Sequence, residues 1–199
     1  MLYHAETSFV PAIAAGTPQA ASLPAPAQSG LIAGTLVETD RGWRPVEALR
    51  PGDEVQTFDG GLQRVLTVQR EVVTGAEGGL VLIPGGVLGA TVPTELLPAQ
   101  HVLLVHHAIE AAFDTPAVLV RAGQLVGLGG ITRRPARARL RAIRPGLAEE
   151  EILWANDGLL LHAPRAHAAT PDTESFFTRP GTAALGRALR AVEAALAGA

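Results

Sequence analysis

From residue 30 onward, the chain consists of short apolar or alternating runs, each ended by glycine, proline, aspartate or asparagine. Runs of about four to eight residues with such boundaries are typical of β-strands. The pattern predicts strands at residues 36–39, 54–58, 62–68, 80–83, 101–105, 149–154 and 159–162. Residues 131–143 alternate arginine with alanine and leucine, so that a strand there would carry its arginines on one side. The body of the chain is therefore expected to be all-β.

Three turns connect the first of these runs. Asp40-Arg41-Gly42 forms a turn that glycine permits, and Arg50-Pro51-Gly52-Asp53 has the proline and glycine positions of a type II turn. Asp59-Gly60 is a strong hairpin signal. Together they predict a β-meander, and Asn156-Asp157-Gly158 similarly joins the last strand pair.

The two ends of the chain have different patterns. Residues 1–29 are rich in alanine, proline, serine and glutamine, and their prolines interrupt any apolar period, which predicts a flexible leader. After Pro180-Gly181, the residues Leu185, Leu189, Val192 and Leu196 form one apolar stripe of a helix that Thr182 would cap. This helix covers either the sheet body or a partner chain.

Composition and charge exclude several classes of site and partner. The chain has 199 residues, 47% of them hydrophobic, and a formal net charge of −3, which indicates one domain and does not favour nucleic acid as a partner. It contains no cysteine, so a disulfide, a thiolate zinc site and a cysteine nucleophile are excluded. Neither a membrane-spanning apolar run nor a secretory signal is found in the sequence, so the cytoplasm is the default expectation.

Several blocks of sequence resemble the bacterial Hint (hedgehog/intein) domains. Residues 44–53 read Arg-Pro-Val-Glu-Ala-Leu-Arg-Pro-Gly-Asp, close to the family's Pro-Val-Glu-Asp-Leu-Arg-Pro-Gly-Asp, and residues 59–61 read Asp-Gly-Gly. Residues 30–35 read Gly-Leu-Ile-Ala-Gly-Thr where the family typically has Cys-Phe-Thr-Pro-Gly-Thr. Residues 96–101 read Leu-Leu-Pro-Ala-Gln-His beside the family's Leu-Val-Ser-Pro-Gln-His, and residues 173–176 match its Thr-Glu-Ser-Phe ending.

The resemblance implies a Hint-type horseshoe of two pseudo-repeated β-halves with a C-terminal helix. The expected parts are a leader at 1–29, a Hint-like β domain at 30–177 and the helical end at 178–199. In the family, the first residue attacks the preceding carbonyl and a histidine protonates the departing amide nitrogen. By this resemblance His101 is the family histidine, and Gly30 occupies the nucleophile position without a side chain. Pro98 stands where the family has a serine or threonine.

Two functions remain open at this point. The first is a degenerate Hint domain, inactive in cleavage or splicing and kept as a binding or structural module. The alternative is an autoprocessing domain in which the hydroxyl of Ser29 performs an N-to-O acyl shift and cleaves after Gln28, which requires a positioned base. The expected partner is the N-terminal flanking peptide of the chain itself or an unknown protein, and the oligomeric state is open.

Other candidate sites have ordinary structural explanations. His106 and His107 follow a strand, where a turn is expected. A shared metal site is not expected, because adjacent side chains of a strand point to opposite faces. The arginines between residues 133 and 144 are explained as a solvated strand edge. Glycines 127–130 lack the Lys-Ser/Thr of a phosphate loop. No cofactor and no metal are expected.

Overall fold

The computed structural model describes residues 29–74, 79–136, 138–166 and 175–197. Strands account for most of the regular structure in these ranges, in the order β1 (Leu31–Ile32), β2 (Leu36–Thr39), β3 (Gly42–Pro45), β4 (Glu54–Thr57), β5 (Gly61–Arg64), β6 (Thr67–Val73), β7 (Leu80–Ile83), β8 (Thr94–Leu96), β9 (His101–Val105), β10 (Ala117–Arg121), β11 (Thr132–Arg134), β12 (Leu140–Gly146), β13 (Glu151–Ala155) and β14 (Leu159–Ala163). The helices are α1 (His107–Phe113) and α2 (Thr182–Ala197), with 3-10 turns at Val46–Ala48, Ala122–Gln124 and Leu128–Gly130. The all-β prediction with a C-terminal helix is confirmed.

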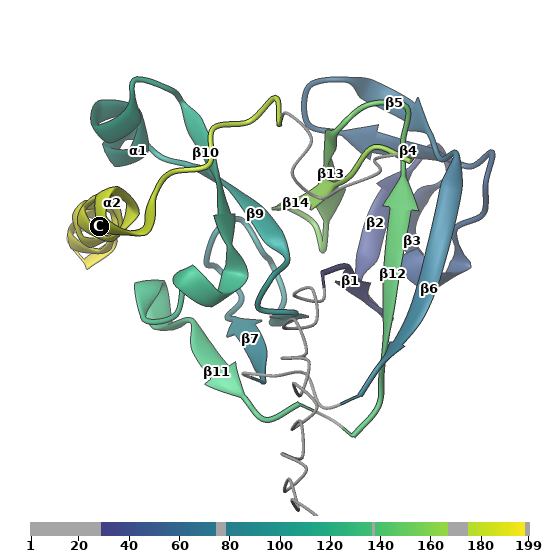
Figure 1. The fold of residues 1–199 in the computed structure, drawn as a ribbon, viewed down its shortest axis with the longest axis horizontal. Coiled ribbons are helices and arrows are strands. Elements are labelled where there is room, and N and C mark those ends of the chain that lie inside the picture. Colours follow the sequence, from purple (N-terminus) through teal and green to yellow (C-terminus); the bar gives the residue numbers. More distant parts are fainter. Residues whose placement is uncertain (1–28, 75–78, 137, 167–174, 198–199) are drawn as a thin grey trace, which may run out of the picture.

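The strands form three antiparallel sheets. The largest has the order β10-β9-β14-β13-β2-β4-β5, with β3 paired to β2, while the two smaller sheets are β1-β12-β6 and β11-β7-β8. Figure 1 shows two lobes, one containing β2 to β6 with β12 and the other containing β7 to β11 with both helices. Since β13 and β14 pair with each other and with strands on either side, they join the two lobes.

The predicted meander is present. β2 and β3 form a hairpin through the Asp40 turn, and β4 and β5 form another. Gly52 has φ +97°, and the amide of Asp53 donates to the carbonyl of Arg50 at 3.1 Å, as a type II turn requires. The Asn156-Asp157-Gly158 turn joins β13 to β14.

Two predicted strands are divided in the structure. The run 62–68 breaks at Val65 and Leu66. The amide of Val65 donates to the carbonyl of Asp53, whereas the amide of Leu66 donates to the carbonyl of Gly146, which belongs to another sheet. The single strand expected at 131–143 was wrong: β11 pairs with β7, whereas β12 pairs with β1 and β6. Pro135 lies between them, where it cannot donate a ladder hydrogen bond.

The turn expected at His106 and His107 was also wrong, because these residues begin α1. His106 is extended, and its Nδ1 accepts a hydrogen bond from the amide of Ala108 at 3.1 Å, so it caps the helix. The signal was hidden because histidine is not among the usual capping residues. The short helix places Ile109 in the core.

The C-terminal helix docks on its own chain. Leu185, Ala188 and Val192 are buried in the main core, and Leu189 packs against it, whereas Leu196 is 47% exposed. The carboxylate of Glu193 also accepts a hydrogen bond from the amide of Gly129 at 2.7 Å. The apolar stripe is thus covered by the body of its own chain, where α2 lies against α1 and the 3-10 turn at Leu128–Gly130. Neither helix of the described ranges has the length and apolarity needed to cross a bilayer.

The β13–β14 turn also ties the lobes together. Asn156 is 7% exposed; its Oδ1 accepts from the amide of Leu36 at 2.9 Å and its Nδ2 donates to Thr94 Oγ1 at 2.8 Å. Beside it the backbones of Gly158 and Gly89 approach so closely that a side-chain carbon on either would overlap the other's carbonyl oxygen. Asn156 thus bonds to β2 and β8, which belong to different sheets.

Truncation of the helix stripe tests the docking of α2. Leu185→Ala should lower the free energy of unfolding by about 2 to 5 kcal/mol, because it leaves a cavity in the main core. The matched control Leu196→Ala removes the same atoms from a half-exposed position and should cost about 0.5 kcal/mol or less. Urea unfolding measures both, and equal losses would contradict docking through this face.

Candidate functional site

Gly30 lies at the entry to β1 and is fully enclosed. It is buried and has φ +134°, a backbone conformation that residues with side chains rarely adopt. A Cβ at this position would lie 3.1 Å from Cγ of Arg144 and 3.3 Å from the carbonyl oxygen of Ile143. The pairing of Leu31 with Ile143 holds the chain there. The position expected to carry a nucleophile therefore has neither a side chain nor a conformation suited to one.

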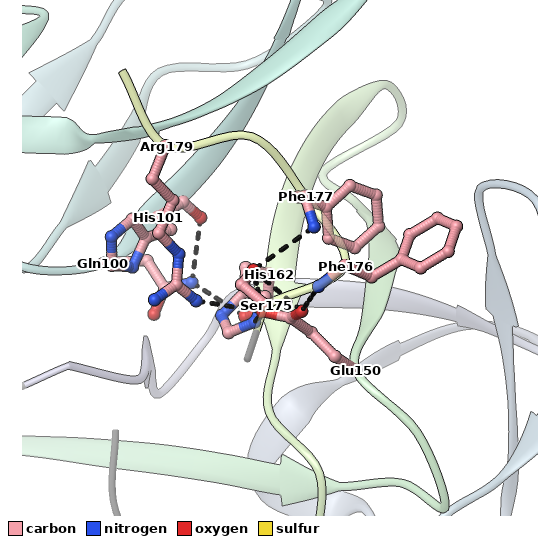
Figure 2. Close-up of polar contacts among 8 residues, drawn as sticks. All are labelled: Gln100, His101, Glu150, His162, Ser175, Phe176, Phe177 and Arg179. Atoms are coloured by element: carbon pink, nitrogen blue, oxygen red, sulfur yellow. Dashed lines mark hydrogen bonds and ion pairs between the residues drawn. The ribbon is translucent and has the colours of Figure 1, made fainter. Parts of the chain in front are cut away.

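Gln100 holds the amide of Gly30. Its Oε1 accepts from that N–H at 2.9 Å, and its Nε2 donates to the carbonyls of His101 at 3.1 Å and His162 at 3.0 Å. The side chain is 3% exposed, so an unpaired amide here would be costly. One residue thus connects the entry to β1 with β9 and β14. Figure 2 shows Gln100 beside His101 and His162.

His101 begins β9, next to Gln100. Its ring meets the ring of His162 edge to face, with 5.8 Å between the centroids. The register explains this contact: Leu161 pairs with Val102 in antiparallel strands, so the following and preceding residues face each other. The pKa of His101 is lowered from 6.5 to about 4, first by burial and then by the charges of His162, Arg179 and Arg121, while Glu150 acts in the opposite direction.

Glu150 is the anion of the site. Its side chain is 14% exposed, and its Oε1 lies 2.7 Å from Nε2 of His162. Burial by itself raises the pKa of this carboxyl, but hydrogen bonds from His162 and Ser175, the charge of His162 and the amide of Phe176 bring it to about 2. Glu150 is therefore ionised at neutral pH and holds the His162 ring in place.

Residues 175–179, called the strap here, cross this site on the way to α2. The hydroxyl of Ser175 lies 2.9 Å from both oxygens of Glu150, and the amide of Phe176 donates to Oε2 at 2.8 Å. Arg179 reaches back from the strap to Oε1 at 2.9 Å (Figure 2). Of the four residues that match the family ending, 173 and 174 lie outside the described residues. The other two, Ser175 and Phe176, take part in these contacts.

The structure brings some predicted site residues together and leaves others without a role. Ser29 is half-buried, and in the described part of the chain no base is hydrogen-bonded to its hydroxyl. Pro98 offers no hydroxyl; its carbonyl accepts from the amide of Gly123 at 2.9 Å. The rest of the predicted leader, residues 1–28, lies outside the described residues. No cluster of three or more candidate metal ligands occurs among the residues with described positions.

Sequence reasoning missed His162 and Glu150. The two residues lie in runs that were assigned only as strands, and the pairing of β14 with β9 is what moves His162 beside His101. β13 also begins at Glu151 rather than at 149, which leaves Glu150 just outside the ladder. A single signal was available: a histidine ending one apolar run and a histidine starting another become neighbours if those runs pair antiparallel.

Comparison with known proteins agrees with this architecture. A bacterial intein-like domain from Clostridium thermocellum, solved in solution, superposes with a TM-score of 0.50 at 15% identity, covering 68% of this chain and 99% of that one. The gp41-1 intein gives a TM-score of 0.47 at 15% identity, with coverage of 68% and 99%. At these identities, the first likeness shows a shared fold. No curated protein matches the chain.

The sequence itself matches the Hint domain family over residues 29–160. That match begins one residue before the enclosed glycine and runs through β13 into β14. It covers more than half of the chain and includes His101 and Gln100. The chain therefore belongs to the Hint domain family.

Proposed function

We propose that this Hint domain performs no self-cleavage or splicing and serves as a binding or structural module. The observation that carries the proposal is Gly30, buried with φ +134° at the position where the family resemblance calls for a nucleophile. Acyl transfer to a side chain needs a thiol or hydroxyl in reach of the preceding carbonyl. Glycine supplies neither, and the chain contains no cysteine at any position.

Two further features support an inert site. The amide nitrogen of Gly30, which would be the leaving group, is already bonded to the buried Oε1 of Gln100. His101, the expected proton donor, has a pKa of about 4, so roughly one molecule in a thousand carries the donor proton at neutral pH. The alternative, an N-to-O acyl shift at Ser29, also needs a base that activates its hydroxyl.

Intact mass tests the proposal directly. The purified full-length protein should keep its whole mass during incubation at neutral pH, with or without dithiothreitol, because no thioester can form. Ser29→Ala is the matched control and should behave identically. Loss of the segment ending at Gln28 from the wild type, but not from Ser29→Ala, would establish the acyl shift instead.

Restoring the family residues should not restore cleavage. In Gly30→Cys combined with Pro98→Thr, the cysteine meets an unfavourable backbone conformation and the amide nitrogen is still held by Gln100. The variant should be less stable than wild type by about 1 to 3 kcal/mol, and it should show no thiol-dependent cleavage on mass spectrometry. Cleavage before residue 30 that His101→Ala abolishes would mean that the site is intact apart from its nucleophile.

The protonation state of His101 can be measured by NMR titration. Its midpoint should lie at about 4 rather than 6.5, and Arg179→Ala should raise it by removing a neighbouring positive charge. Because the folded-state pKa is the lower one, the unfolded chain binds the extra proton between these values. The stability contributed by His101 is thus complete above pH 6.5 and is lost as the pH falls toward 4. A midpoint near 6.5 would contradict the burial argument.

A further inference from the structure

The strap lies across the protein surface as an irregular segment that bends at Phe176 and Phe177. Along it, half-buried Ser175 and Phe177 alternate with exposed Phe176 and Thr178, and the Phe176 side chain is 85% exposed. Arg179 is exposed as a whole residue, but its guanidinium lies against Glu150 and its side chain is 30% exposed. The body of the protein, called the receptor here, therefore contacts some side chains of the strap and leaves others to the solvent.

The receptor side contributes a sheet edge. β10 is the last strand of the large sheet, and among the described residues no further strand pairs with its outer side. The amide of Leu119 in β10 donates to the carbonyl of Thr178 at 2.9 Å. One main-chain hydrogen bond thus joins the strap to this edge, and the unpaired groups of a sheet edge are those that an added peptide uses.

The receptor contacts two of the strap side chains, one apolar and one charged. Phe177 packs against the small apolar cluster on the outer face of the large sheet, formed by Leu103, Leu119, Ile152 and Leu160. The Arg179 guanidinium binds the Glu150 carboxylate at 2.9 Å, and the same carboxylate accepts from Ser175 and Phe176. An aromatic residue and an arginine two positions later are thus both recognised.

From these contacts we infer that the strap site, formed by Glu150, the β10 edge and the apolar cluster, is a recognition site for peptides. Its ligand class is a segment with an aromatic residue followed two positions later by arginine, and the strap is its occupant in cis. This inference rests on the proposed binding role and supplies that role with a partner class. A competing peptide must displace the strap, which is present at the high effective concentration of a tethered ligand.

The test uses a fluorescent, N-acetylated peptide with the sequence of residues 175–181 and the full-length protein. Phe177→Ala combined with Arg179→Ala weakens only the occupant and leaves the receptor residues unchanged. This double variant should bind the peptide at least about tenfold more tightly than wild type does in fluorescence anisotropy. Replacing arginine by alanine in the peptide, or Glu150→Gln in the protein, should weaken binding by about tenfold or more, because each removes a charge-assisted hydrogen bond.

The controls separate folding from recognition. Circular dichroism checks each variant, and if the double variant does not fold, the single variant Arg179→Ala replaces it with the same expectation. The inference is overturned if a folded variant does not bind the peptide, or if the alanine peptide binds equally well. A wild-type dimer that the peptide disperses would put the strap of a second copy in the strap site and would overturn occupancy in cis. The intact-mass result is independent of all these outcomes, so the two proposals can fail separately.

Discussion

The hydrogen bonds of the Gln100 side chain are the constraint on which the site depends. With 3% exposure, both its oxygen and its nitrogen must be paired inside the protein, and their partners come from β1's entry, β9 and β14. Satisfying one buried amide thus fixes the relative positions of three segments that are far apart in sequence. The backbones of Gly30, His101 and His162 are placed by this requirement.

The charge states of Glu150 and His101 also follow from the burial of this site. A carboxylate as little exposed as Glu150 is stable only with several donors, and His162, Ser175, Phe176 and Arg179 supply them. Burial is the main cause that lowers the pKa of His101, and the neighbouring Arg179 and Arg121 add to it, so its imidazole is neutral at neutral pH. A strong anion and a weakly basic histidine therefore arise from one arrangement, which suits recognition of cationic groups better than proton transfer at neutral pH.

The local structure was largely predictable, since it is specified by neighbouring residues. The type II turn at Gly52, the hairpin at Gly60 and the apolar stripe of α2 all depend on short-range chemistry. The break at Pro135 was readable in principle, but the arginine alternation on either side concealed it. The partners of Gln100 and Glu150 were not predictable, because strand pairing decides them: β14 pairs with β9 across more than fifty residues. Capping by His106 was missed because it depends on ring orientation.

The contact between Gly89 and Gly158 has a consequence for how this fold varies. Because two backbones meet there with no room for a side chain, their separation is set by main-chain geometry and not by the volume of any residue. A change of volume in a core side chain elsewhere acts on how the adjoining sheets pack, whereas a side chain added at either glycine acts on the spacing of the backbones themselves. The approach of the two lobes at this crossing therefore depends on two positions that must stay without side chains.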